Sequence, residues 1–208
     1  MTPKDIIASH TYEETTYAQQ LYFTFILSEN MKKIPYGRTR GSFVFAFTDD
    51  NKLVFTNHPD RGYDLGGGKM DEEDNNDAVN CAIREFNEET ESQEIVRSTM
   101  TRIGIGSFVN LGSTSTKFPD SVYKFEYFYG QVKRAKITRK TKQDSKGELI
   151  ATLEEARELK KVKQHQLFFD AAVKMHREMC LKSKCETSTT FDDPTNYYNL
   201  LRDLPNSS

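Results

Sequence analysis

Three glutamates near the middle of the chain have the spacing of a metal site. Glu85, Glu88 and Glu89 stand at positions i, i+3 and i+4, so on a helix their carboxylates share one face. Like charges this close repel one another and weaken an isolated helix. A divalent cation removes the repulsion, and proteins hold Mg²⁺ with a few carboxylates together with substrate phosphate oxygens. The spacing therefore predicts either a Mg²⁺ site or, for the glutamates taken alone, a solvated acidic helix.

Two neighbouring features favour the metal site over the solvated helix. Arg84 directly precedes the first glutamate and can pair with a nearby carboxylate and fix its rotamer. Upstream, Gly66, Gly67 and Gly68 form an uninterrupted run, and glycine permits tight turns and a close approach of the backbone to a site. The combination is more specific than the glutamates alone and indicates a metal site.

The stretch from residue 66 to residue 91, GGGKMDEEDNNDAVNCAIREFNEETE, resembles the signature of the Nudix hydrolase family. That signature is a glycine, five residues, Glu, seven residues, Arg-Glu, an apolar residue, any residue, Glu-Glu, any residue and Gly. Its second half is intact here as Arg84-Glu85-Phe86-Asn87-Glu88-Glu89. Residues 63–69 resemble the family's run of strand into glycine loop, and residues 150–156 resemble its strand leading into a Leu-Glu-Glu helix. The resemblance therefore covers roughly residues 38–180.

The chain departs from the signature in two places. Counted forward from Gly68 the first signature Glu falls at Asp74, and counted back from Arg84 it falls at Asn76, so the loop is two residues longer than the pattern. Glu91 stands where the signature ends in Gly, which predicts a helix that runs on or ends with a different cap. Neither change touches the three glutamates.

The resemblance implies an α/β fold, the Nudix-type α/β/α sandwich with a mixed β-sheet. It also implies a hydrolase that cleaves a diphosphate linkage in a nucleoside diphosphate derivative. Mg²⁺ or Mn²⁺ bound by Glu85, Glu88 and Glu89, with Gly68 beside them, would lower the pKa of the attacking water. ADP-ribose-like compounds or dinucleoside polyphosphates are the default substrates. The alternatives are an mRNA cap, a diphosphoinositol polyphosphate, or a catalytically inactive module that binds a nucleotide.

The resemblance also implies a general base, either one of the box glutamates, such as Glu88 or Glu89, or an acid further along. The candidates outside the box are Glu126, Asp144 and Glu148. Glu148 is preferred, because the glycine before it would let a loop swing the acid over bound substrate.

Three arginines are candidate substrate contacts. Arg84 lies in the motif itself, and Arg38 and Arg40 enter the first core strand. A phosphate contact is one interpretation of the latter two, and exposed strand-end charge is the other.

Local patterns predict the elements that carry these residues. Two β-prone runs around Asp49-Asp50-Asn51 form a hairpin signal, and an apolar stripe behind Asp77 predicts a helix from about residue 77 to 90. Residues 21–27 fit a short helix or a strand. Further strands are predicted at 103–111 and 122–132, and further helices at 153–162 and 164–181. The strand at 122–132 has alternating aromatic residues, which predicts one buried face.

The whole chain fits one domain with additions at both ends. Its 208 residues are enough for a single core, and we expect an N-terminal extension packing on the core (1–36), a Nudix hydrolase domain (37–182) and a polar C-terminal tail (183–208). No apolar run is long enough to span a bilayer, and the N-terminus has no signal-peptide pattern, so no membrane partner is expected. The sequence does not set the oligomeric state.

Cysteine content favours a reducing compartment. The three cysteines, Cys81, Cys180 and Cys185, are odd in number and have no metal-ligand spacing. A cytoplasmic location suits them better than a disulfide framework.

A basic segment raises the question of a large anionic substrate. The formal charge of −2 gives no general attraction to nucleic acid, but residues 133–146 carry seven lysines and arginines against Asp144 alone. One interpretation is a solvated loop. The other is steering of a polyanion such as capped RNA or an inositol pyrophosphate.

Reversing the charge of this segment separates the two. We predict that Arg139→Glu combined with Lys140→Glu leaves kcat/KM for a small nucleotide substrate nearly unchanged. For capped RNA or an inositol pyrophosphate, kcat/KM should fall and its dependence on salt should flatten. Steady-state kinetics at two salt concentrations measures both effects.

Overall fold

The computed structural model describes residues 11–16, 19–27, 38–59, 62–111, 122–135 and 147–187. The strands are β1 (Thr11–Thr16), β2 (Gln19–Leu27), β3 (Arg38–Phe47), β4 (Leu53–His58), β5 (Gly62–Lys69), β6 (Gln93–Ile95), β7 (Thr101–Leu111), β8 (Val122–Arg134) and β9 (Glu148–Ala151). The helices are α1 (Ala78–Glu89), α2 (Leu153–Glu158), α3 (Lys160–Gln164) and α4 (Gln166–Thr187), with short 3-10 turns η3 (Glu72–Asp74) and η4 (Arg97–Thr99).

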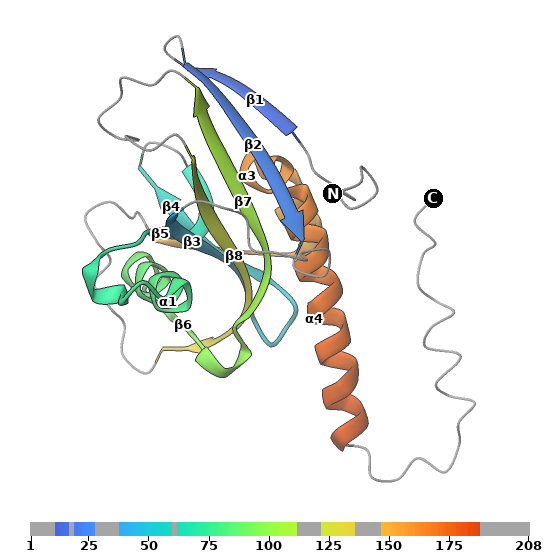
Figure 1. Cartoon of the computed structure of the whole chain (residues 1–208). Coiled ribbons are helices and arrows are strands. Elements are labelled where there is room, and N and C mark those ends of the chain that lie inside the picture. Colours follow the sequence, from blue (N-terminus) through green and yellow to red (C-terminus); the bar gives the residue numbers. More distant parts are fainter. Residues whose placement is uncertain are drawn as a thin grey trace.

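The strands form one curled, mixed sheet (Figure 1). Their order is β1-β2-β7-β8-β3-β5-β4-β9, and β6 pairs with β8 at the side. β3 and β8 are parallel, while the other described pairs are antiparallel. β1 and β2 join the sheet through β7, so residues 21–27 are a strand rather than a helix.

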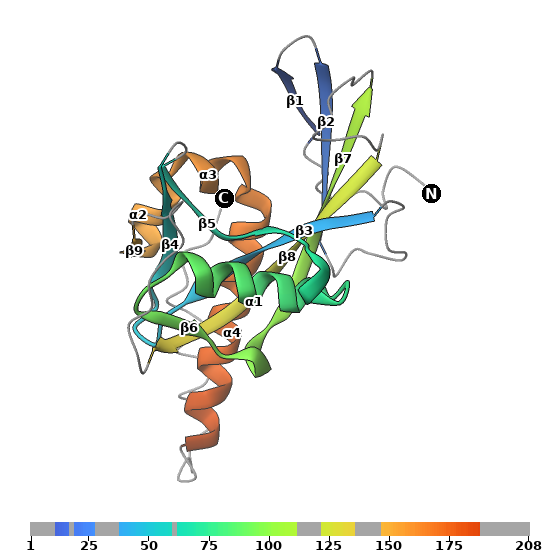
Figure 2. The same cartoon turned by 90° about the vertical axis from the view of Figure 1, so that its left-hand side faces the viewer.

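Helices cover both faces of the sheet, as Figures 1 and 2 show for α1 and α4. Side chains alternate between the faces along a strand, and β3 displays this directly. Phe45 packs in one core cluster with Phe169 of α4, their ring centroids 6.3 Å apart. Val44 and Ala46 belong to the second cluster, with Phe86 of α1. The prediction of an α/β/α sandwich with a mixed sheet is confirmed.

The prediction of a single buried face on β8 is wrong. Tyr127 and Tyr129 are buried in the expected cluster beneath α4. Phe128 and Val132, on the opposite face, are buried as well and pack in the cluster of α1. A central strand with a helix on each side has no solvent face, which the local pattern of one strand does not reveal.

The other predicted elements are confirmed with changed bounds. The hairpin forms with Ala46 opposite Val54. The helix predicted at 153–162 is two helices, α2 and α3, because Leu159 between them has an extended backbone with ψ of 133°. Within the described residues, no helix combines the length and apolar character needed to cross a bilayer.

Helix α1 begins and ends with side-chain caps. Asp77 accepts a hydrogen bond from the N–H of Val79 at 2.8 Å, which confirms the predicted N-cap. At the other end the helix stops at Glu89, and the Thr90 hydroxyl donates to the Phe86 carbonyl at 2.8 Å. Thr90 has an extended backbone with φ of −113°. This end uses no left-handed residue, so Glu91 can replace the signature glycine.

Gly67 lets β5 and β3 lie together beneath α1. Its φ is +144°, and a Cβ added to it would lie 2.2 Å from the Ser42 carbonyl oxygen of β3. Any other residue there meets both backbone strain and a collision with backbone that cannot move aside.

Two alanine substitutions separate strain from collision. Gly67→Ala should lower the unfolding free energy by about 2–6 kcal/mol, the sum of strain and overpacking. Gly62→Ala is the matched control, because Gly62 has φ of +73° and open space around it, so it should cost only about 1–2 kcal/mol. Urea denaturation measures both, and equal losses would contradict the packing described.

Candidate active site

Helix α1 packs against the glycine run of β5, Gly66 to Gly68. A Cβ added to Gly68 would lie 2.6 Å from the carboxyl carbon of Glu85. The absence of a side chain at Gly68 is therefore what makes room for the Glu85 carboxylate. Gly66 plays the same part for the buried Phe86 ring, which a Cβ would meet at 2.4 Å. Together these contacts fix the rotation of α1 on the sheet.

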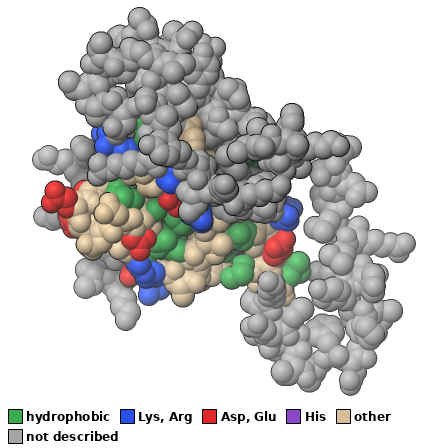
Figure 3. Space-filling model, in the orientation of Figure 1, with side chains coloured by type: hydrophobic (Ala, Val, Ile, Leu, Met, Phe, Trp, Pro, Cys, Tyr) green, Lys and Arg blue, Asp and Glu red, His purple; other side chains and the backbone are tan. Residues whose placement is uncertain are grey.

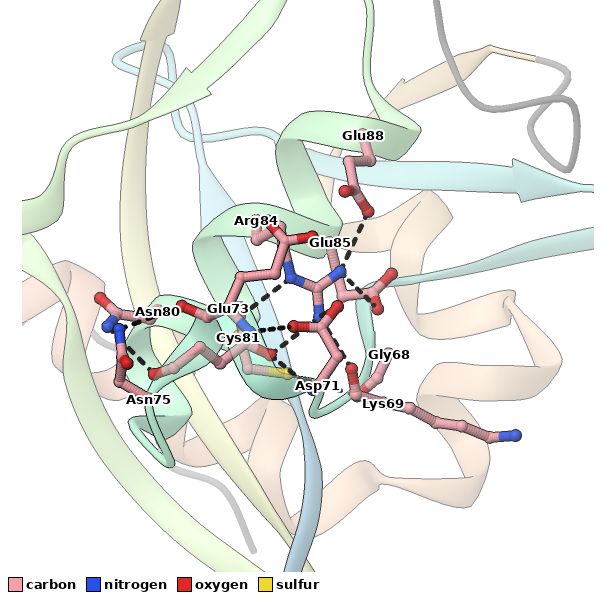
Figure 4. A network of polar contacts seen from close by, with 11 residues as sticks. Gly68, Lys69, Asp71, Glu73, Asn75, Asn80, Cys81, Arg84, Glu85 and Glu88 are labelled. Carbon is pink, nitrogen blue, oxygen red and sulfur yellow. Dashed lines mark hydrogen bonds and ion pairs between the residues drawn. The ribbon is translucent and has the colours of Figure 1, made fainter. Parts of the chain in front are cut away.

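Arg84 connects the loop before the helix to the glutamates on it (Figure 4). Its Nε and Nη2 donate to the two carboxylate oxygens of Asp74 at 2.9 and 2.8 Å. Its Nη1 donates to Glu85 Oε1 at 3.0 Å and to Glu88 Oε2 at 3.2 Å. A further bond runs from Nη2 to the Lys69 carbonyl at 2.9 Å. One guanidinium thus orients three carboxylates, which its planar donor fork suits.

Asp74 is the buried end of this arrangement, with 1% of its surface exposed. Hydrogen bonding to Arg84 lowers the pKa of Asp74, against the opposing effect of burial. The hydrogen bond to Asp74 and the charge of Glu85 raise the pKa of Arg84 above its ordinary value. Both partners are therefore ionised at neutral pH.

The two extra loop residues lie between Asp74 and the helix. Asn75 and Asn76 both have left-handed backbones, with φ of 54° and 57°, a conformation that asparagine tolerates better than most residues. They return the chain to the N-cap at Asp77. Of the two positions offered by counting for the first signature acid, the structure therefore selects Asp74, and Asn76 is exposed turn backbone.

The third glutamate is held by the glycine run instead of by Arg84. Glu89 Oε2 accepts a hydrogen bond from the Gly67 N–H at 3.2 Å. The side chains of Glu85 and Glu88 are 13% and 30% exposed. In the part of the chain that the structure describes, no three His, Cys, Asp or Glu side chains already stand close enough to hold a metal ion.

Cys81 lies beneath this site and is not suited to nucleophilic chemistry. Its thiol contacts the Gly68 carbonyl oxygen at 3.7 Å, and burial raises its pKa to about 11. The nucleophile in thiol chemistry is the thiolate. Cys81 is therefore a packing residue on the helix face that meets the glycine run.

Glu148 does not lie on a free loop. It is the first residue of β9 and pairs with Thr56 of β4. Its Oε2 accepts from the backbone N–H groups of Glu91 and Ser92, each at 3.2 Å, and the Ser92 hydroxyl donates to Oε1. The carboxylate is thus already attached to the turn that directly follows α1.

Glu126, the rival acid, lies on β8 opposite Ser42 of β3, and Ser42 lies opposite Gly68 of β5. Glu126 accepts from the Thr39 hydroxyl at 3.2 Å and from Arg102 Nη1 at 3.1 Å. Its partners are therefore a threonine of β3 and an arginine of β7. Asp144 lies outside the described residues.

Of the two candidate arginines on β3, the structure describes the surroundings of Arg40. The β3–β8 register shifts between Thr39 and Gly41, so Arg40 is the extra residue of a bulge, which re-aims a side chain. Burial raises the pKa of Tyr123 of β8, and the nearby Arg40 charge acts in the opposite direction. The Arg38 side chain lies outside what the structure describes.

Two participants escaped the sequence analysis. Asp71 Oδ2 lies 3.2 Å from Arg84 Nη2, and it caps η3 in a capping box with Asp74. The spacing of Asp71 and Asp74 was a readable signal of that box. Ser92 had no such signal, because its partner Glu148 lies 56 residues away in sequence.

No family model matches the chain, and no curated protein sequence does. Among solved structures, the chain is similar to a Bacillus subtilis pyrophosphohydrolase, BsRppH, at 22% identity, covering 72% of this chain and 84% of that one with a TM-score of 0.49. A Nudix hydrolase from Nitrosomonas europaea is similar at 19% identity, covering 64% of this chain and 90% of that one with a TM-score of 0.45. An Ap4A hydrolase from C. elegans is similar at 10% identity, covering 67% of this chain and 98% of that one with a TM-score of 0.46. These likenesses are remote, so the function rests on the residues themselves.

Removing the charge of Asp74 should weaken the fold and change its response to acid. Asp74→Asn should lower the unfolding free energy at pH 7 by about 3–5 kcal/mol, because it leaves a largely buried arginine without its main partner. The folded pKa of Asp74 is depressed, so its contribution is full above the ordinary value of 3.8 and is lost as pH falls through the lower folded value. The variant should therefore lose less stability than the wild type over that acidic range.

Asp71→Asn is the matched control. The Asp71 side chain is 44% exposed and asparagine still caps a helix turn, so the loss should be about 0–1 kcal/mol. Chemical denaturation from pH 7 down to the acidic range measures all three proteins. Equal losses in the two variants would show that Asp74 is not the buried anchor.

Proposed function

We propose that the chain is a Nudix-type hydrolase that cleaves a diphosphate linkage in a nucleoside diphosphate derivative with Mg²⁺ or Mn²⁺. The observation that carries the proposal is the bond set of Arg84, which holds Glu85 and Glu88 on one helix face while anchored to buried Asp74. An acidic helix with no function has no need of such an anchor. Here Arg84 holds two carboxylates together on one helix face, which is the arrangement that a cation site requires.

The residues present fit a hard divalent cation. Glu85, Glu88 and Glu89 offer carboxylate oxygens, the ligand type that Mg²⁺ prefers, and the backbone carbonyl of Gly68 is the fourth proposed ligand. The Glu85 carboxylate occupies space that any side chain at Gly68 would fill. When bound, the cation neutralises the diphosphate and lowers the pKa of the attacking water.

The remaining roles fall to residues around that face. Arg84 keeps the rotamers of Glu85 and Glu88 fixed as substrate charge arrives. Glu88, Glu89 and Glu148 are the proposed catalytic acids, with Glu148 as the general base. Arg38 and Arg40 are the proposed contacts to substrate phosphates. The N–H groups of Arg84, the third candidate, already donate to Asp74, Glu85, Glu88 and the Lys69 carbonyl.

A small phosphorylated nucleotide, ADP-ribose-like or a dinucleoside polyphosphate, is the proposed substrate. On the face shown in Figure 3, acidic and basic side chains of the described residues are interspersed, a surface that suits a small ligand better than a long polyanion. The chain has three cysteines at no metal-ligand spacing, in keeping with the cytoplasmic location we propose. Capped RNA and diphosphoinositol polyphosphates remain the alternative substrates, and a nucleotide-binding module without activity the alternative function.

A phosphate-release screen tests the proposal. Nucleoside diphosphate sugars, dinucleotides, nucleoside triphosphates, inositol pyrophosphates and capped RNA should be incubated with the full chain, with and without Mg²⁺. Hydrolysis of at least one class that requires Mg²⁺ supports the enzyme. Tight nucleotide binding by calorimetry without any product would favour the binding module instead.

Neutralising the helix glutamates should abolish turnover without unfolding the protein. Glu88→Gln and Glu89→Gln should each lower kcat by roughly two to four orders of magnitude, the scale of acid–base and electrostatic catalysis. Their unfolding free energies should change by about 1 kcal/mol or less, because a glutamine oxygen can still accept the hydrogen bond from Arg84 or from the Gly67 N–H. Glu91→Gln, an exposed acid just beyond the helix, is the control and should retain full activity. Near-normal kcat in both helix variants would contradict the assignment of Glu88 and Glu89 as catalytic residues.

Two further variants decide which acid completes the site. Glu148→Gln should lower kcat with little change in the metal affinity of the free protein, because the carboxylate is bound to the turn after α1. Glu126→Gln should be close to wild type in kcat, since Glu126 is bound to Thr39 and Arg102. The reverse pattern would assign the base to the strand.

A further inference from the structure

The turn after α1 is built around the Glu148 carboxylate. α1 ends at Glu89 and β6 begins at Gln93, so a few residues connect the helix to the sheet. Thr90 closes this turn by donating its hydroxyl to the Gln93 carbonyl at 3.2 Å as well as to the helix end. The N–H groups of Glu91 and Ser92 and the Ser92 hydroxyl then converge on one carboxylate.

The backbone of Glu148 is fixed from the other side. It pairs with Thr56 of β4, and the carbonyl of Gly147 accepts a hydrogen bond from the Asn57 N–H at 2.9 Å. β9 is separated from the glycine strand β5 by β4 in the sheet order. The side-chain contact with Ser92 is therefore a direct connection between this outer strand and the end of the glutamate helix.

Of the three donors, only the Ser92 hydroxyl depends on a side chain. The two backbone N–H groups would remain with any residue at position 92. They both bind Oε2, so the carboxylate could rotate about that oxygen. The Ser92 hydroxyl binds Oε1 and thereby fixes the plane of the carboxylate.

We propose that Ser92 is a positioning residue for the proposed hydrolysis, which orients the Glu148 carboxylate beside the C-terminal end of α1. The inference rests on the proposed function and adds a residue to it. Ser92 acts through Glu148: its hydroxyl, which also accepts a hydrogen bond from Gln93 Nε2 at 3.3 Å, sets the direction in which the carboxylate presents its oxygens. Orientation of a catalytic group contributes strongly to rate, and small misplacements are costly.

The test uses the full chain and the substrate found in the screen. Ser92→Ala should lower kcat by about tenfold, within the range that misplacement of a catalytic group produces, and should leave KM within about twofold. Ser92→Thr keeps a hydroxyl and should restore most of the lost kcat. Ser107→Ala is the matched control and should match the wild type, because the Ser107 hydroxyl on β7 is buried and has no hydrogen-bond partner among the described residues.

A double-mutant cycle separates positioning from a general structural role. In the Glu148→Gln background, Ser92→Ala should cause no further loss, because residues that act as one unit are not additive. The inference is overturned if Ser92→Ala has wild-type kcat, or if it lowers the kcat of Glu148→Gln by the same factor as that of the wild type.

The proposed hydrolysis and the positioning role of Ser92 can be contradicted separately. If the wild type hydrolyses a substrate, Glu88→Gln does not, and Ser92→Ala is unaffected, only the role of Ser92 is wrong. If the wild type hydrolyses nothing in the screen while the protein is folded, the proposed function fails and the role of Ser92 fails with it.

Discussion

The ion pair between Arg84 and Asp74 is the interaction on which the rest of the site depends. Asp74 is buried and its carboxylate takes two hydrogen bonds from the guanidinium. Breaking a buried pair costs about 3–5 kcal/mol, a large share of the total stability of a domain. Because the pair holds Arg84 in one rotamer, its remaining N–H groups reach Glu85 and Glu88 from a fixed direction. The buried Arg84–Asp74 pair therefore holds in place glutamates whose charges repel one another.

The second constraint is the close contact between α1 and the glycine strand. Side chains at Gly66 or Gly68 would collide with Phe86 or with the Glu85 carboxylate, so the glycines set both the depth and the rotation of the helix. Phe86 then fills the core cluster on that face of the sheet. The same helix is thus an element of the hydrophobic core on one side and of the charged site on the other. Stability and chemistry are coupled through it.

Sequence alone predicted the parts of this arrangement that have a local period or spacing. The helix around Glu85, its cap at Asp77 and the mixed α/β fold were readable from pattern and resemblance. The choice between Asp74 and Asn76 was not, because it depends on two left-handed asparagines whose turn the family spacing does not include. Ser92 and the burial of Phe128 were also hidden, since each depends on a partner element distant in the chain. Local patterns report a residue's own element, and tertiary contacts decide its neighbours.

The central claim is that the face of α1 carrying Glu85, Glu88 and Glu89 binds a divalent cation. The most direct measurement is a titration of the full chain with Mn²⁺ followed by electron paramagnetic resonance, in the wild type and in Glu88→Gln. The account predicts saturable binding by the wild type that competes with Mg²⁺ and is weakened by about tenfold or more in the variant, as expected on loss of a ligand. Equal Mn²⁺ binding by both proteins, or no saturable binding by the wild type, would contradict it.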